Sequence, residues 1–180
     1  GGPGVRRVPF RSARKWELDD PRFDTRNAGY ENETNRFGWI VEVDPFDPTS
    51  TPKKHSSLGR FKHEGANVIV ADSGHVVAYM GDDERFDYLY KFVSAGKYRE
   101  GDRTHNMTLL SAGNLYVARF TGNSPLEEIT GAGNVPADGS FDGTGEWLPL
   151  VVDGASAVPG MTLDEVLFYT RLAADTLGPT

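Results

Sequence analysis

The sequence predicts a mainly β domain with one C-terminal helix, and three observations lead to that prediction. Apolar runs of strand length, at residues 67–71 and 75–80, are each followed by a short turn containing Gly and Asp. Aromatic residues then alternate with other residues from 86 to 92, the period of a half-buried strand. The 21 Gly and 11 Pro residues favour a loop-rich architecture. Short strands at this spacing are typical of sandwiches, barrels and propellers.

Further strands are expected on both sides of this region. Residues 37–43 (FGWIVEV) form an apolar run that a Pro-rich loop ends. Residues 108–120 (TLLSAGNLYVARF) predict a hairpin that turns at Ala112-Gly113-Asn114. Residues 121–145 are rich in Gly, Asn and Asp, and a connection of this length is usually functional or disordered. A last strand is expected at residues 147–152.

The C-terminal region has the period of a helix, predicted from Leu163 to Leu177. Thr162 and Glu165 have the spacing of a capping box at its start. Gly178 and Pro179 supply its end. For the whole chain, we expect a flexible basic arm at residues 1–15 and a single mainly β domain at residues 16–180.

Composition excludes several classes of function. The net charge of −7 argues against nucleic-acid binding, which needs clustered Lys and Arg. No apolar run has the length of a membrane span, and no signal peptide is present in this chain. The chain has no Cys, so it cannot supply a disulfide, a Cys nucleophile or a thiolate ligand.

His63 and Glu64 are the first candidates for a site, because hard cations prefer carboxylate oxygen. Adjacent residues of a strand point to opposite faces, so the two side chains should not share one site. From the bare sequence, an ion pair of Glu64 with Arg60 or Lys62 is the favoured interpretation.

The acidic turn Asp82-Asp83-Glu84-Arg85 is the second candidate, although its spacing does not match an EF-hand loop. An exposed hairpin turn is the favoured interpretation there. Asp44, Asp47 and three scattered histidines are weaker candidates: His55, His75 and His105. The sequence has no nucleophile elbow, phosphate-binding loop or HExxH motif, so the catalytic residues stay unknown and no organic cofactor site is predicted.

The sequence does resemble a known family. The segments NRFGWIVEVDPFDP, KKHSSLGRFKHEGA, YMGDDERFDYLYKFVS, NLYVARF, GEWLPL and TLDEVLFYTRLAADTLGPT are similar, in this order, to segments of the PhoX-type alkaline phosphatases. The resemblance runs from about residue 16 to residue 180. It implies a portion of a β-propeller, in a secreted bacterial phosphomonoesterase that uses calcium and iron and is exported by the twin-arginine route to the periplasm or beyond.

The resemblance also implies one site residue. Glu64 matches the family's calcium-binding Glu in the GRFxHEGA segment, and this match outweighs the ion-pair interpretation. The resemblance does not assign a ligand role to His63, Asp82 or Asp83 as it does to Glu64, and their roles stay open. The family's iron-bridging Cys and its Arg-Pro-Glu motif are absent from this chain. We therefore expect an internal fragment that is inactive alone.

Two further expectations remain open. A fragment of a propeller exposes strand edges, so self-association through an edge strand is expected. Alternative functions are a non-catalytic binding module with structural calcium and a lactonase-like calcium hydrolase. The expected partners are otherwise a phosphomonoester substrate, with no nucleic acid and no membrane.

Overall fold

A computed structural model describes residues 14–122 and 143–178 of the chain. The chain divides into two compact units, one ending at Phe37 and one starting at Gly38. Most of the predicted basic arm, and residues 123–142 of the predicted long connection, lie outside the described residues. The prediction of a single domain from residue 16 to residue 180 stays a prediction.

The N-terminal unit consists of three short 3₁₀ helices, η1 (Trp16–Leu18), η2 (Pro21–Phe23) and η3 (Glu33–Arg36). The rings of Trp16 and Phe23 lie 5.9 Å apart. Arg22 and Arg36 flank the buried carboxylate of Glu33, at 3.7 Å and 3.2 Å. A few ring contacts and ion pairs therefore hold this unit.

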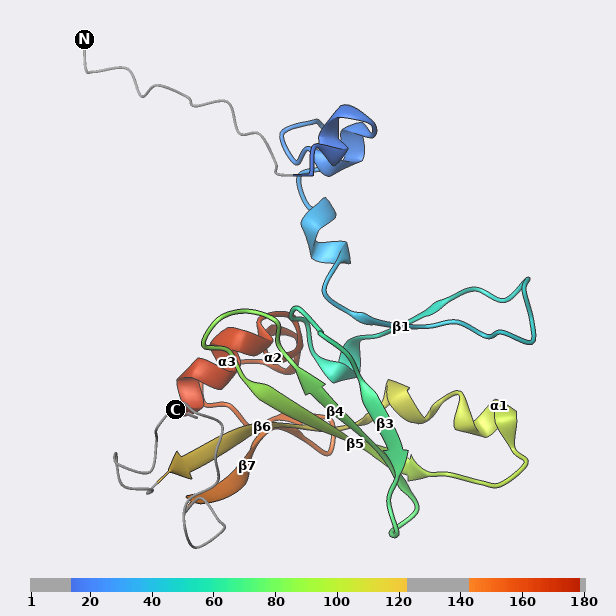
Figure 1. Cartoon of the computed structure of the whole chain (residues 1–180), viewed down its shortest axis with the longest axis vertical. Coiled ribbons are helices and arrows are strands. Elements are labelled where there is room, and N and C mark those ends of the chain that lie inside the picture. Colours follow the sequence, from blue (N-terminus) through green and yellow to red (C-terminus); the bar gives the residue numbers. More distant parts are fainter. Residues whose placement is uncertain (1–13, 123–142, 179–180) are drawn as a thin grey trace, which may run out of the picture. The chain divides into compact units, whose positions relative to one another are not determined.

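A six-stranded antiparallel sheet dominates the second unit, with its strands in sequence order from β3 to β8 (Figure 1). The strands are β3 (Asn67–Val70), β4 (His75–Gly81), β5 (Leu89–Lys97), β6 (Gly113–Gly122), β7 (Gly143–Val152) and β8 (Ala155–Ser156). Two shorter strands, β1 (Ile40–Glu42) and β2 (Lys53–His55), form a separate antiparallel pair. The short helix α1 (Arg103–Asn106) and the 3₁₀ helix η5 (Leu109–Ser111) connect β5 to β6.

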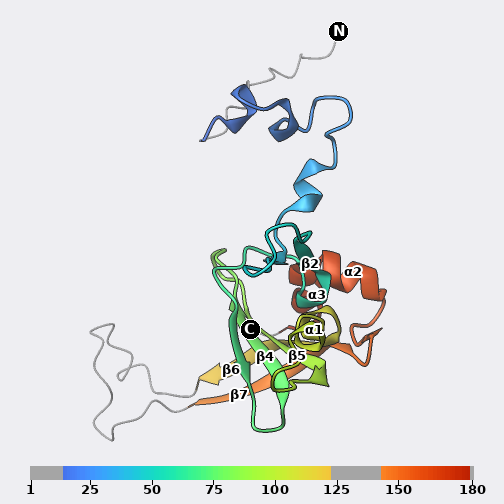
Figure 2. The same cartoon turned by 90° about the vertical axis from the view of Figure 1, so that its right-hand side faces the viewer.

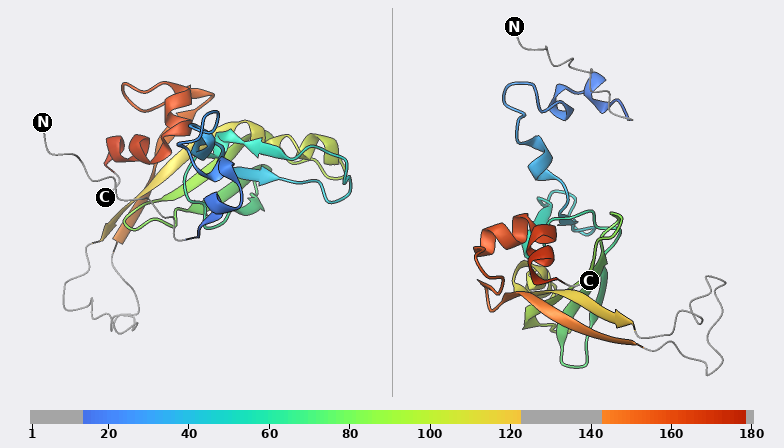
Figure 3. Two further views of the ribbon diagram at one scale, coloured as in Figure 1. Left: turned by 90° about the horizontal axis from the view of Figure 1, so that it is seen from above. Right: turned by 90° about the vertical axis from the view of Figure 1, so that its left-hand side faces the viewer.

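Two helices, α2 (Leu163–Phe168) and α3 (Thr170–Leu177), lie on one side of this sheet (Figures 2 and 3). The core is the layer between them. Its fully buried members include Tyr90, Phe92 and Leu115 from the strands, and Val166 and Ala173 from the helices. The sheet and these helices therefore form two layers around one core.

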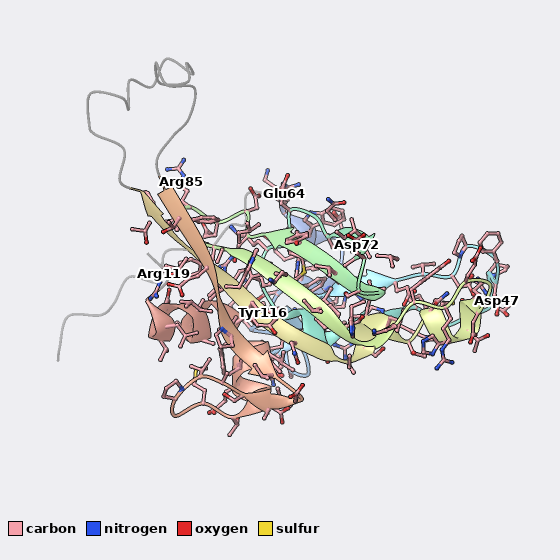
Figure 4. The ribbon with its side chains drawn as sticks, turned by 90° about the horizontal axis from the view of Figure 1, so that it is seen from below. Asp47, Glu64, Asp72, Arg85, Tyr116 and Arg119 are labelled. Carbon is pink, nitrogen blue, oxygen red and sulfur yellow. The ribbon has the colours of Figure 1, made fainter. Side chains whose placement is uncertain are left out.

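The opposite face of the sheet is seen in Figure 4, with Tyr116 on it. On that face, the Lys91 ammonium lies 4.4 Å from the ring centroid of Trp147 and 5.1 Å from that of Tyr116. Burial lowers the pKa of Lys91. This face is therefore more apolar and more aromatic than an ordinary solvated sheet face.

The mainly β prediction is confirmed, and its details need three corrections. The predicted hairpin at residues 108–120 is wrong, because residues 109–111 form η5 and Gly113 to Gly122 is one strand. The single C-terminal helix is broken at Tyr169. Phe86 is 95% exposed at a φ of 65°, so the buried aromatic alternation holds only from Tyr88 onward. The strands of the described residues form two open sheets, so the propeller stays a prediction.

Candidate functional site

Glu64 ends a short segment that leaves the 3₁₀ helix η4 (Ser56–Leu58) through Gly59. Gly59 has a φ of 79°, a conformation that L side chains rarely adopt, and it turns the chain toward the sheet. Two backbone hydrogen bonds then fix the path. Phe61 N donates to Gly38 O at 3.0 Å, and Arg60 N donates to Leu167 O at 3.0 Å.

The Glu64 segment pairs with the end of β4. Glu64 N donates to Gly81 O at 3.0 Å, and Asp83 N donates to Lys62 O at 2.9 Å. Between these two bonds, His63 and Asp82 form an antiparallel β-bridge. Glu64 is thus held by regular backbone pairing, which gives its side chain a defined direction. We call residues 62–64 and 81–83 together the bridge.

His63 and Glu64 point to opposite sides of this bridge, as strand alternation predicts. The His63 ring stacks on Phe61 with centroids 3.7 Å apart, and Phe61 in turn stacks on Tyr90 at 4.3 Å. His63 Nε2 lies 3.1 Å from Gly59 O, and burial lowers the His63 pKa. His63 therefore belongs to the core side, whereas Glu64 is exposed.

The expected ion pair of Glu64 with Arg60 or Lys62 is absent among the described residues. Lys62 Nζ instead contacts Glu84 Oε2 at 2.5 Å. The guanidinium of Arg60 lies 4.7 Å from the ring centroid of Phe168. Within the described part of the chain, no side chain or backbone group hydrogen-bonds to the Glu64 carboxylate, so both of its oxygens are available to a ligand.

The acidic turn differs from its prediction at one residue. Asp83, Glu84 and Arg85 are exposed, but the side chain of Asp82 is fully buried. Arg171 donates to both of its oxygens, from Nε and from Nη2, at 2.5 Å each. An exposed hairpin turn is therefore wrong for Asp82. Its charged partner on α3 offsets the desolvation cost of burying the carboxylate.

The weaker candidates have structural partners and lie elsewhere. Figure 4 shows Asp47 well away from Glu64. The partners are Arg103 for Asp44, Thr49 for Asp47, Glu42 for His55, Ser94 O for His75 and Lys97 O for His105. None of these contacts brings a candidate residue toward Glu64.

The described residues contain no group of three or more His, Asp or Glu side chains able to hold a metal ion. Glu64 by itself fits calcium in kind, since carboxylate oxygen is a preferred calcium ligand, but calcium takes six to eight oxygens. The iron centre implied by the resemblance does not fit, because the chain has no Cys to bridge it. The described residues therefore offer Glu64 as a candidate calcium ligand and contain no complete metal cage.

Three cavities open on the second unit, and Glu64 lines none of them. The largest of the three, about 710 Å³, includes Ser57, His75, Ser111 and Asn114 in its lining. Ser57 and His75 hydrogen-bond to backbone oxygens, and Ser111 lies 3.5 Å from Nδ1 of His55, which is outside the lining. The candidate site is therefore an exposed carboxylate on the bridge, outside these three cavities.

Nothing in the sequence pattern singles out Arg171. It lies on a helix surface, where an Arg usually faces solvent. It is also 89 residues from Asp82 in the sequence. The only available signal was local: Asp82 follows directly on an apolar strand, at a position where a carboxylate is half-buried. Its partner could be found only from the tertiary structure.

The described residues contain no helix long and apolar enough to cross a membrane. The family model described as "Alkaline phosphatase PhoX" matches residues 4–180. Among solved structures, PhoX of Pseudomonas fluorescens in complex with vanadate, a transition state analogue, is similar, with 42% sequence identity and a TM-score of 0.71. The match covers 91% of this chain and 26% of that one. No curated protein matches the chain.

Proposed function

Because this chain belongs to the PhoX family of alkaline phosphatases, we propose that it is part of a phosphomonoesterase, in which it carries one calcium ligand. The observation that supports the activity is the family match over residues 4–180. The similar Pseudomonas fluorescens protein binds vanadate, a transition state analogue. This chain spans about a quarter of that protein's length, so the activity, substrate and partners of a whole enzyme are part of the proposal.

Glu64 is the residue that we propose as the calcium ligand. Its side chain is exposed and makes no hydrogen bond or ion pair with the described residues, while its backbone is paired in the bridge. Asp82 is a poor alternative, because Arg171 occupies both of its oxygens. Calcium, when bound, would supply positive charge to the phosphate oxygens. Glu64 itself would hold and orient the ion, and the stiff bridge would keep the carboxylate in place.

Because the described residues place no group of three or more His, Asp or Glu side chains around a metal ion, we propose that the remaining ligands come from elsewhere in a whole enzyme. The same holds for iron, which the family resemblance implies and for which the chain has no thiolate. We therefore propose that the 180-residue chain does not hydrolyse phosphomonoesters alone, and that a whole enzyme acts in the periplasm or outside the cell, where proteins of this family are exported. A propeller built from further sheets is the architecture proposed for that enzyme.

Calorimetric titration with calcium tests the role of Glu64. We expect weak binding by the chain, with a dissociation constant of about 1 mM, the range of sites with few ligands. Glu64→Ala should abolish the binding heat. Asp72→Ala is the matched control, since Asp72 is also exposed and lies in the β3–β4 turn (Figure 4), and it should bind like the unmodified chain. Equal binding by the Glu64→Ala chain would rule out Glu64 as the ligand.

An assay with p-nitrophenyl phosphate tests the second part of the proposal. The chain alone should release no p-nitrophenol above the background rate, with or without calcium. Robust calcium-dependent hydrolysis by this chain would show that its own residues complete the active site.

Self-association through an edge strand is proposed as well, and β3 is the edge that favours it. All four residues of β3 are exposed, and three of them, Val68, Ile69 and Val70, are apolar. An edge of this kind invites pairing with another strand. Sedimentation should show association that Ile69→Lys reduces, whereas a strict monomer at high concentration would contradict the proposal.

A further inference from the structure

The bridge that carries Glu64 is small. Its two sides are joined by one pair of backbone hydrogen bonds, Glu64 N to Gly81 O and Asp83 N to Lys62 O. A pairing this short is not stable in water by itself. Contacts from another part of the chain must therefore keep the two sides together. The first turn of α3 contacts Asp82 on one side and Arg60, two residues before the other side.

The first side of the bridge is continuous with residues held by Thr170. The backbone N of Arg60 lies 2.9 Å from Thr170 Oγ1 and 3.0 Å from Leu167 O. Thr170 is fully buried, and its hydroxyl donates in turn to Leu167 O at 3.0 Å. The chain that leads into Glu64 is thus fixed to the start of α3.

The second side of the bridge is held by the next residue of the helix. Arg171 Nε and Nη2 each lie 2.5 Å from an oxygen of Asp82, whose side chain has no exposure to solvent. A bidentate Arg–carboxylate pair fixes both distance and orientation. Asp82 is also the bridge partner of His63, the residue before Glu64. Adjacent residues of α3 therefore hold Asp82 in one side of the bridge and Arg60 just before the other side.

We propose that Asp82 and Arg171 are positioning residues, which hold the backbone of Glu64, and so the point from which its carboxylate projects, by locking the bridge to α3. The expected effect on calcium binding rests on the function proposed above. The expected effect on the stability of the bridge does not, because it concerns only the backbone around Glu64. Neither residue touches the ion or the substrate in this proposal, and both act through Glu64.

The structure supplies a matched control on the same helix. Tyr88 OH donates to Asp175 Oδ1 at 2.6 Å, which also ties α3 to the segment between β4 and β5. Asp175 lies one helical turn after Arg171 and makes no hydrogen bond or ion pair with residues 62–64 or 81–83 in the described chain. Asp175→Asn therefore removes a carboxylate charge from α3, while its amide oxygen can still accept from Tyr88 OH and the hydrogen bonds of the bridge are kept.

Amide hydrogen exchange is the test that does not depend on calcium. In Asp82→Asn, the amides of Glu64 and Asp83 should exchange at least about tenfold faster, relative to the amides of the central strands β5 and β6. Asp175→Asn should leave that ratio unchanged. The proposal is overturned if the ratio does not rise in Asp82→Asn, or if Asp175→Asn raises it equally.

Two additions keep the experiment decisive. If Asp82→Asn does not fold, Arg171→Lys keeps the charge but loses the bidentate geometry, and the same ratio should rise about threefold. Calcium titration then measures the effect on calcium binding. If the unmodified chain binds calcium, Asp82→Asn should weaken binding about tenfold, and Asp175→Asn should not. No calcium binding by the unmodified chain would count against the proposed function alone, while the exchange ratio still decides whether Asp82 and Arg171 position Glu64.

Discussion

Gly59 lies directly against Thr170, so closely that a Cβ atom on Gly59 would lie 2.7 Å from the Thr170 hydroxyl oxygen. The same atom would lie 2.9 Å from Thr170 Cγ2. Both residues are near the point where the chain turns toward Glu64. The absence of a side chain at residue 59 is therefore what allows α3 to approach the segment that carries the candidate site.

Replacing Gly59 by Ala should destabilise the second unit strongly. The new methyl group meets Thr170, and the φ of 79° is unfavourable for any L side chain, so we expect a loss of about 3 kcal/mol. Urea unfolding measures it. Gly101→Ala is the control, because Gly101 has a φ of 75° but open space around it, and it should cost about 1 kcal/mol. Equal losses would show that the contact with Thr170 costs nothing.

Tyr90→Phe should leave stability unchanged or raise it by about 1 kcal/mol. Tyr90 is fully buried, and its hydroxyl oxygen has no hydrogen-bond partner among the described residues. Removing the hydroxyl therefore removes a desolvated polar group and keeps the ring stacked on Phe61. Thermal and urea unfolding measure the change. A loss above about 1 kcal/mol would mean that the hydroxyl has a partner, such as a buried water.

In the N-terminal unit, Asp24 should titrate at an unusually low pH. The hydrogen bond from the Arg26 side chain, followed by that from the Arg26 backbone, lowers the pKa of Asp24 to about 2. A lowered folded-state pKa means that the carboxylate contributes stability above the unfolded pKa, near 3.8, and loses it as the pH falls toward 2. NMR titration of the Asp24 carboxyl reads the midpoint directly. In Arg26→Gln the midpoint should rise, and an unchanged midpoint would exclude Arg26 as the cause.

The capping box at the start of α2 gives a prediction for Thr162. Glu165 N donates to Thr162 Oγ1 at 3.3 Å, and Thr162 N donates to Glu165 Oε2 at 2.8 Å. Thr162→Ala removes the first of these bonds, so unfolding should become easier by about 1 kcal/mol. Thr176→Ala in α3 is the control, since Thr176 is exposed and Ala is the better helix former. A Thr162→Ala chain as stable as the control would show that the cap contributes nothing.

Local patterns in the sequence predicted the parts of the fold that depend on local chemistry. The capping box at Thr162 is present, and the strands at residues 67–71 and 75–80 are found within a residue of their predicted ends. The hairpin at residues 108–120 failed because Ala112-Gly113-Asn114 has turn chemistry but starts a strand. Gly113 packs there against Phe92, where a Cβ would lie 2.5 Å from the ring. The glycine serves a close packing contact, which a single sequence does not reveal.

The candidate site was likewise predicted from the sequence only in part. The opposite directions of His63 and Glu64 followed from strand alternation alone, and the structure agrees. The burial of the Asp82 side chain could not be predicted from the sequence, because its partner Arg171 lies 89 residues further along the chain. Favouring Glu64 over Asp82 as a ligand needed the family resemblance, and only the structure supplies a physical reason: the Asp82 oxygens are already occupied.

The ion pair between Asp82 and Arg171 also bears on the order in which contacts form during folding. It closes a loop of 89 residues, and contacts of such long sequence separation form late in folding because closing the loop costs entropy. The hairpins of the sheet join neighbouring strands and need no such closure. In a refolding experiment with pulse labelling, the amide of Glu64 should therefore gain protection after those of β4 and β5. A chain still emerging from the ribosome would have most of its sheet before it could present Glu64 in a fixed direction.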